Sequence, residues 1–180
     1  MDPEQIAQAM ERVASVVRCK PHAGVMDDPA ATARWDGGLH GSVHSDAGFW
    51  VATDMPVEIG GAASAVSPGW LLRAGLASCA MTRIAMAAAA EGIALCTLEV
   101  RATSRSDVRG LLAVPEPDGR PVPAGPLAMA LHVTISAPGV DAERLRALVR
   151  STACCSPVTG AVESALPVAL HIEVAAAAAR

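Results

Sequence analysis

A long helix that is apolar almost all the way round is the feature that most limits what this 180-residue chain can fold into. Ser67 is a natural N-cap, Pro68 suits the first helical position, and Gly92 is a stop signal, so the sequence predicts a helix over 68–91. A helix without a polar face is normally covered on several sides. At 24 residues it would be about 36 Å long, the length of a small domain. We therefore expect it to form the centre of the fold.

The same stretch also raises the question of a membrane span. Residues 74–90 are mostly Ala and Gly, and Arg83 lies near their middle. One Arg at the bilayer centre costs about 2.5–3.5 kcal/mol on the insertion scale, and Ala does not offset that cost. The N-terminus, MDPEQIAQAMER, has neither the basic nor the apolar region of a signal peptide. We therefore expect a buried helix in a cytoplasmic protein that makes no membrane contact.

The composition indicates a second subunit. Apolar residues make up 52% of the chain and charged residues only 18%, against a usual value of about 25%. A single small domain has little interior to spare for this apolar excess, so we expect a buried homodimer interface. The net charge of −4 and the shortage of aromatic side chains argue against nucleic-acid binding.

Patterning along the rest of the chain predicts a mixed α+β domain. Apolar spacing and turn signals predict further helices at 2–18, 142–153 and 157–165, and strands at 31–35, 39–44, 49–53, 95–104, 127–135 and 167–174. These elements do not alternate as regular βαβ units. We therefore expect mostly antiparallel sheets with helices packed on them.

Cysteine is the side chain best placed to carry chemistry in this chain. Cys79 lies within the predicted long helix, and Arg83 follows one turn later on the same face. A permanent cation near a thiol stabilises the thiolate, which is the nucleophilic form. A cysteine on an Ala-rich helix is more often a small core residue, so the residues alone leave both interpretations open.

The remaining cysteines and the histidines give weaker signals. Cys154 and Cys155 lie at a break between two predicted helices, where exposed N–H groups favour a thiolate; the alternative is a pair of ordinary buried cysteines. Cys19 and Cys96 have no such context, and we expect them to be structural. Incomplete pairs such as Cys19 with His22 make a mixed Cys/His metal site a third, weaker hypothesis, and we expect no metal and no cofactor.

Residues 67–79, SPGWLLRAGLASC, resemble the signature of the OsmC/Ohr family (osmotically inducible protein C and organic hydroperoxide resistance proteins). In that signature an Asn/Ser-Pro start leads through a Leu- and Ala-rich helix to a reactive cysteine twelve residues later, which is the spacing from Ser67 to Cys79. Further similar segments are WDGG at 35–38, TDMP at 53–56 and SPVT at 156–159. The resemblance covers roughly residues 31–174.

The resemblance implies an OsmC-like fold, an intertwined homodimer in which mostly antiparallel sheets wrap two long central helices. The functional sites of that fold lie at the subunit interface. We expect one OsmC-like domain over 1–180, with an N-terminal helix and loop at 1–30, the family-like core at 31–174 and a tail at 175–180.

The resemblance also implies a thiol-dependent peroxidase that reduces organic hydroperoxides. Cys79 would attack the peroxide O–O bond and become a sulfenic acid, and a second cysteine would close a disulfide. An external dithiol, a lipoylated protein in the family, would then reopen it. In this chain Cys155 is the candidate second cysteine and Arg83 the candidate stabiliser of the thiolate.

Three departures from the family pattern leave a second hypothesis open. Ser156 occupies the position of the second cysteine, and Gly69 stands where peroxidatic members have a Glu. The family's activating Arg from an early glycine-rich strand has no direct counterpart, which leaves Arg34 and Arg83 as the nearest candidates. The alternative is a non-catalytic dimer of the same fold that binds a small apolar or thiol-containing ligand at its interface.

Overall fold

The computed structural model describes residues 2–153, 155–164 and 166–175. Its elements, in chain order, are α1 (Pro3–Cys19), the 3₁₀ turn η1 (Pro21–Gly24), β1 (Ala31–Gly37), β2 (His40–Ser45), β3 (Trp50–Thr53), the 3₁₀ turn η2 (Val57–Ile59), α2 (Pro68–Ala90), β4 (Thr97–Arg105), α3 (Val108–Leu111), β5 (Ala128–Ser136), α4 (Ala142–Ala153) and α5 (Pro157–Glu163). The mixed α+β class and the antiparallel sheets are confirmed. Each predicted element except the last strand is present, with ends shifted by a few residues.

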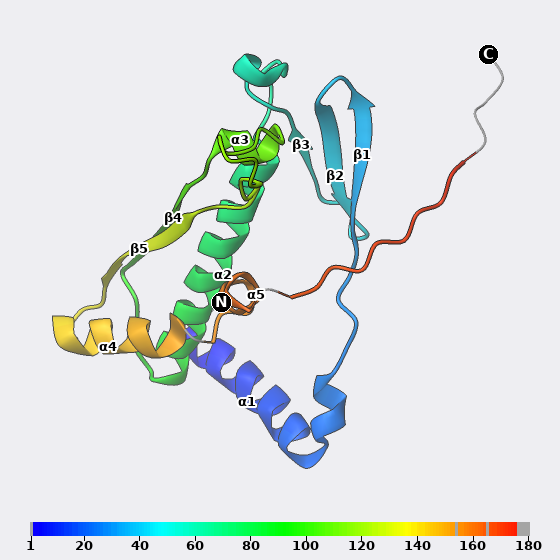
Figure 1. Cartoon of the computed structure of the whole chain (residues 1–180). Coiled ribbons are helices and arrows are strands. Elements are labelled where there is room, and N and C mark those ends of the chain that lie inside the picture. Colours follow the sequence, from blue (N-terminus) through cyan, green and yellow to red (C-terminus); the bar gives the residue numbers. More distant parts are fainter. Residues whose placement is uncertain (1, 154, 165, 176–180) are drawn as a thin grey trace.

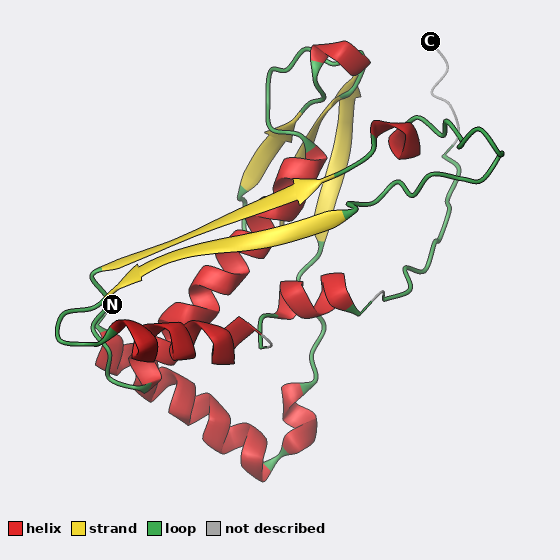
Figure 2. Cartoon of the chain, turned by 60° about the vertical axis from the view of Figure 1, so that its left-hand side comes forward, coloured by secondary structure: helices red, strands yellow, loops and turns green. Residues whose placement is uncertain are grey.

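The central helix α2 organises the molecule, as its sequence predicts. The hydroxyl of Ser67 caps its N-terminus by accepting a hydrogen bond from the backbone N–H of Trp70 at 3.2 Å. Four elements pack against α2, namely α1, β4, α4 and α5. Figures 1 and 2 show α2 running between the β4–β5 hairpin and the other helices. The residues that this packing buries are Leu76, Ala80, Ile84, Ala88 and Ala89.

Length and composition alone would also allow α2 to cross a membrane. In the structure it serves instead as the packed helix at the centre of the fold. Arg73 and Arg83 interrupt its apolar sequence, and Arg73 Nη1 donates a hydrogen bond to Ser104 Oγ on β4 at 3.2 Å. Within this chain α2 therefore packs against the rest of the fold, while Trp70, Leu72 and Met81 stay partly exposed.

The β4–β5 hairpin forms the second layer of the core. The two strands pair antiparallel along their whole length, from Thr97 opposite Ser136 to Arg105 opposite Ala128. Alternate side chains face α2 and α4 and pack on one apolar cluster. The buried members of that cluster are Ile84, Ala88, Ile93, Leu145 and Leu148, and the strand residues against it are Leu98, Val100, Val133 and Ile135.

The three-stranded sheet β1–β2–β3 stands on the other side of α2 from this hairpin (Figure 1). Its large apolar side chains are mostly uncovered in this chain. Trp35 of β1 is 78% exposed and Trp50 of β3 is 65% exposed, and Phe49, directly before β3, is 78% exposed. The sheet therefore has an apolar surface that the described residues do not bury.

The loop between β3 and α2 is folded around a buried carboxylate. Asp54 is 2% exposed and accepts hydrogen bonds from Ser64 N–H at 3.0 Å, Ser64 Oγ at 2.8 Å, Met55 N–H at 2.7 Å and Ala62 N–H at 3.1 Å. These bonds, led by those from Ser64, lower the pKa of Asp54 to about 2. A Cβ at Gly61 would lie 1.9 Å from the carbonyl oxygen of Met55, so only glycine fits there. The loop thereby fixes where α2 begins.

The predicted strand at 167–174 is wrong for the isolated chain. This segment belongs to neither sheet and extends away from the helices (Figure 1). Its sequence alternates as a strand should, yet a strand also needs a neighbour to take its backbone hydrogen bonds, and no described strand of this chain pairs with it. The apolar side chains that this segment leaves exposed are Val168, Leu170, Ile172 and Val174, and Leu166 directly before it is exposed too.

Candidate active site around Cys79

The fold brings Cys79, on α2, against Ser156, which directly precedes α5. Ser156 Oγ donates a hydrogen bond to Cys79 Sγ at 3.3 Å. Ser156 is 2% exposed and Cys79 is half-buried. The packing of α5 on α2 creates this contact between residues that are 77 positions apart in the sequence.

The hydroxyl of Ser156 is used in an unusual way for its position. Ser156 is the N-cap residue of α5, with extended backbone angles (φ −84°, ψ 116°), yet its side chain makes no capping hydrogen bond. A serine at this position normally accepts a hydrogen bond from a backbone N–H of the first helical turn. Here the hydroxyl is directed to the sulfur of Cys79 instead.

Cys155, the predicted second cysteine, lies in the turn that joins α4 to Ser156. Its side chain is exposed, and its backbone N–H donates to the carbonyl of Thr152 at 3.0 Å. The structure thus places Ser156, the residue after Cys155, in direct contact with Cys79. Cys154 lies outside the described residues, and the pairing of Cys79 with Cys155 stays a prediction.

Arg83, the predicted stabiliser, follows Cys79 by one helical turn. Its Nη1 lies 3.8 Å from Met86 Sδ. Its Nε is buried and has no hydrogen-bond partner among the residues that the structure describes. Among those residues Arg83 makes no hydrogen bond to Cys79, so its role toward the thiol also stays a prediction. A buried N–H of a permanent cation is nevertheless well suited to an anionic partner.

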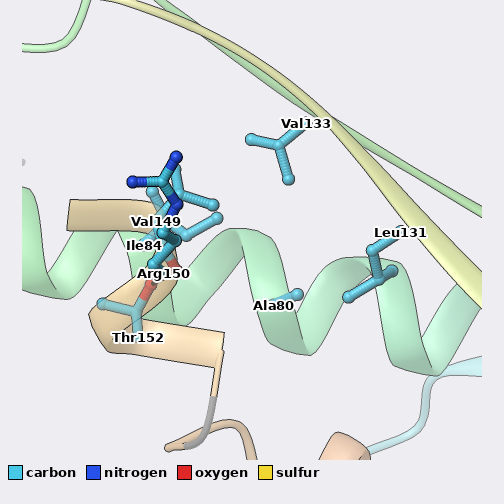
Figure 3. A pocket seen from close by; sticks show the side chains of 7 residues that line it. All are labelled: Ala80, Ile84, Leu131, Val133, Val149, Arg150 and Thr152. Atoms are coloured by element: carbon cyan, nitrogen blue, oxygen red, sulfur yellow. Dashed lines mark hydrogen bonds between the residues drawn. The ribbon is translucent and has the colours of Figure 1, made fainter. Parts of the chain in front are cut away.

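Two apolar pockets lie between α2 and β5, beside the turn of α2 that carries Cys79. The first has a volume of about 210 Å³, and Figure 3 shows Ala80 and Ile84 of α2 on one side of it and Leu131 and Val133 of β5 on the other. Val149, Arg150 and Thr152 of α4 complete its lining. The second, of about 320 Å³, lies toward α5 and is lined by Leu76, Met129, Ala130, Leu131, Thr159, Val162 and Glu163. Leu131 lines both pockets.

The other cysteines, and the histidines of the first sheet, do not join this site. Cys19 and Cys96, expected to be structural, are exposed in this chain. His40 Nδ1 lies 3.7 Å from an oxygen of Asp36, and His44 Nε2 contacts Ser42 Oγ at 3.0 Å. No group of three or more His, Cys, Asp or Glu side chains placed to hold a metal ion occurs in the described part of the chain.

Sequence reasoning identified Ser156 only as a substitution, not as a contact of Cys79. The available signal was its place in the resemblance, because the position that holds the second cysteine in the family must come close to the first. Thr159, one turn along α5, was missed altogether. Its Oγ1 is buried, without a hydrogen-bond partner among the described residues, beside the second pocket.

Comparison with known proteins places this site in a wider context. The family model "OsmC-like protein" matches residues 61–171, more than half of the chain. No curated protein matches the chain.

Solved structures with the same fold include a Legionella pneumophila protein described as an organic hydroperoxide resistance protein OsmC and predicted redox protein (23% identity, 77% of this chain and 90% of that chain, TM-score 0.56). An OsmC-like protein from Mycoplasma pneumoniae (20%, 78% and 89%, 0.59) and an OsmC-like protein of unknown function from Vibrio cholerae (13%, 77% and 95%, 0.62) are also similar. At these identities the structural likeness shows the fold alone.

Proposed function

The chain belongs to the OsmC-like protein family, and from that premise we propose that it is a thiol-dependent peroxidase that reduces organic hydroperoxides. The observation that carries the proposal is the placement of Cys79, a half-buried thiol in the middle of α2 that accepts a hydrogen bond from Ser156. Fold neighbours described as organic hydroperoxide resistance proteins, from Legionella pneumophila and Elizabethkingia anophelis, support the substrate class.

The proposed reaction has two chemical steps on the protein. The thiolate of Cys79 attacks the terminal oxygen of the hydroperoxide, the O–O bond breaks, and the alkoxide takes up a proton and leaves as an alcohol. Cys79 is then a sulfenic acid. The thiol of Cys155 attacks its sulfur, an S–S bond forms and water leaves. An external dithiol, such as a lipoylated protein, reduces this disulfide and becomes a disulfide itself.

Arg83 is the proposed electrostatic partner of Cys79 in the first step. It lies one turn away on the same helix, and its buried Nε–H has no partner among the described residues. A guanidinium stabilises the thiolate and the negative charge that develops on the departing oxygen. The proposal therefore assigns Cys79 as the nucleophile, Cys155 as the resolving thiol and Arg83 as the stabilising cation.

The two apolar pockets support an organic rather than an inorganic peroxide. They lie on the row of α2 residues next to Cys79, and aliphatic side chains make up most of their linings. Hydrogen peroxide has no apolar part to bury there, whereas an alkyl or aryl tail gains about 25 cal/mol for each Å² of apolar surface removed from water. The proposed substrates are therefore hydroperoxides with an apolar tail.

We further infer that the chain works as a homodimer in the cytoplasm. The resemblance to the OsmC/Ohr family implies a homodimer, and this chain leaves apolar surface for a second copy to cover. That surface includes the partly exposed side chains Trp70, Leu72 and Met81 of α2, the sheet β1–β2–β3, and the extended segment 166–174. A cycle driven by an external dithiol suits the reducing cytoplasm. We expect no nucleic acid, membrane or cofactor to take part.

The test is hydroperoxide consumption by the reduced protein with dihydrolipoamide as the electron donor. Wild-type protein should consume cumene hydroperoxide, and Cys79→Ser should reduce the rate by at least about 100-fold, because the nucleophile is lost. Cys155→Ser should allow one turnover and then stall without a disulfide. Cys96→Ser, which replaces an exposed thiol elsewhere, is the matched control. Consumption by Cys79→Ser at the wild-type rate would rule out the proposal.

A non-catalytic, ligand-binding dimer is the second candidate. The specific observation in its favour is that no described cation donates a hydrogen bond to Cys79, and that Gly69 stands where the peroxidatic members of the family have a Glu. On this hypothesis the pockets beside α2 would bind an apolar or thiol-containing ligand without turnover. It predicts that an apolar fluorescent probe binds to wild type and Cys79→Ser alike, and that neither consumes hydroperoxide.

A further inference from the structure

Ser156 has a hydroxyl group that its own helix does not use. It is the N-cap residue of α5, but no backbone N–H of α5 donates to its side chain. Its hydroxyl proton is instead donated to Cys79 Sγ at 3.3 Å. Because Ser156 is only 2% exposed, water has little access to this hydrogen bond. The arrangement removes a normal capping contact and provides one to the candidate nucleophile.

We propose that Ser156 is a positioning residue that holds the sulfur of Cys79 and stabilises its ionised form. The inference rests on the proposed function of Cys79 and adds a specific role at the same site. An O–H group that donates to an anion makes a stronger hydrogen bond than one that donates to a neutral acceptor. The bond from Ser156 therefore favours the thiolate over the thiol, and it keeps the sulfur facing α5.

The same contact has a consequence for the oxidised protein. A hydroxyl beside a sulfenic acid cannot form a disulfide with it. The oxidised Cys79 therefore needs a thiol from another residue to form one. In the proposed cycle that thiol is the neighbouring Cys155, which is exposed. Ser156 thus separates the oxidation of Cys79 from the formation of the disulfide, and it should lengthen the life of the sulfenic acid.

The first experiment measures the reactivity of Cys79 without any peroxide. Iodoacetamide alkylation of Cys79, followed at neutral pH by peptide mass mapping, should slow about tenfold in Ser156→Ala, as expected for the loss of one hydrogen bond to a charged group. The ultraviolet absorbance of the thiolate should fall in parallel. Ser156→Thr keeps a hydroxyl and should restore most of the rate. Ser164→Ala, at the exposed C-terminal end of α5, is the matched control and should react like wild type.

Two results would overturn the positioning role. One is an alkylation rate in a folded Ser156→Ala protein equal to that of wild type. The other is a Ser156→Thr protein that folds but reacts as slowly as Ser156→Ala, because that pattern indicates a packing effect rather than a hydroxyl effect. Neither result depends on peroxide consumption, so failure here is distinguishable from failure of the proposed peroxidase activity.

The second experiment tests the geometry directly. The 3.3 Å between Ser156 Oγ and Cys79 Sγ exceeds a disulfide bond of about 2.05 Å by little more than 1 Å. Ser156→Cys, in a Cys155→Ser background, should therefore form a disulfide with Cys79 when diamide takes up the two electrons and two protons that the thiols release. Ser164→Cys in the same background should not. Absence of that bridge in Ser156→Cys, shown by non-reducing peptide mapping, would contradict the contact.

Discussion

Two helices of this protein begin with the same dipeptide, Ser-Pro, and use the serine differently. At the start of α2, Ser67 has extended backbone angles (φ −79°, ψ 156°) and its hydroxyl accepts a hydrogen bond from Trp70 N–H. At the start of α5, Ser156 has similar angles (φ −84°, ψ 116°), but its hydroxyl donates to Cys79 Sγ. The local sequence is the same, and the partner of the hydroxyl is not.

The difference indicates that the serine of α2 stabilises its helix, whereas the serine of α5 contributes to the candidate site. An N-cap hydrogen bond contributes about 1 kcal/mol, and the 23-residue α2 uses it. The seven-residue α5 forgoes it. Its serine lies instead against the thiol to which the proposed chemistry belongs. A residue that gives up a local stabilising contact for a distant one is a reasonable marker of a functional site.

The largest loss of stability should come from a substitution in the loop between β3 and α2, which positions Ser67. Asp54→Asn removes the charge that holds the backbone and side chain of Ser64 and the N–H groups of Met55 and Ala62. The free energy of unfolding, measured by urea titration, should fall by more than it does for any serine substitution described below. A variant as stable as wild type would show that this loop does not fix the start of α2.

Acid should reproduce part of the same loss. The pKa of Asp54 is about 2 in the folded protein and about 3.9 in an unfolded chain. Because the folded value is the lower one, the stability due to Asp54 is fully present above about pH 4 and is lost as the pH falls toward about 2. The difference in urea midpoint between wild type and Asp54→Asn should therefore shrink over that range. A difference that stays constant with pH would contradict the assignment.

A smaller loss of stability is expected at the N-terminus of α2. Ser67→Ala should lower the free energy of unfolding by about 1 kcal/mol, because α2 loses its cap, while the alkylation rate of Cys79 stays at the wild-type value. Urea unfolding and peptide mapping measure the two quantities on one sample. A change in Cys79 reactivity comparable to that in Ser156→Ala would show that the two serines are not as different as the structure indicates.

The smallest loss of stability is expected at the N-terminus of α5. Ser156→Ala removes no capping bond, and the sulfur it leaves is only a weak hydrogen-bond acceptor. Its stability cost should be below about 0.5 kcal/mol, less than that of Ser67→Ala. A larger cost than at Ser67 would assign Ser156 to the structure of the chain rather than to the site.

Patterns within short stretches of sequence predicted those helices and strands whose formation depends on neighbouring residues alone. The caps and apolar surface of α2, the alternation of β4 and β5, and the helix α4 (Ala142–Ala153) all follow from spacing in the sequence. The segment 167–174 has an equally good strand pattern, but pairing is a property of two strands. The sequence of one strand therefore could not show whether a neighbour is present in the same chain.

The site was predictable only in part, for a related physical reason. The resemblance identified Cys79, because the spacing from Ser67 to Cys79 lies within one helix. The partner of its sulfur depends on how α5 packs on α2, and a shift of one residue exchanges Cys155 for Ser156 at that place. No local pattern distinguishes those two residues. The helical spacing predicts that Arg83 lies near the thiol, but it could not show which atoms its guanidinium contacts.

The most direct test of the account is to map the product of one equivalent of cumene hydroperoxide on the reduced protein. Peptide mass spectrometry in the presence of dimedone should find position 79 modified, either as the trapped sulfenic acid or as a disulfide with Cys155. The exposed Cys19 and Cys96 should remain largely unmodified. Oxidation that spares Cys79, or that spreads evenly over the exposed thiols, would contradict the claim that this thiol is the reactive centre.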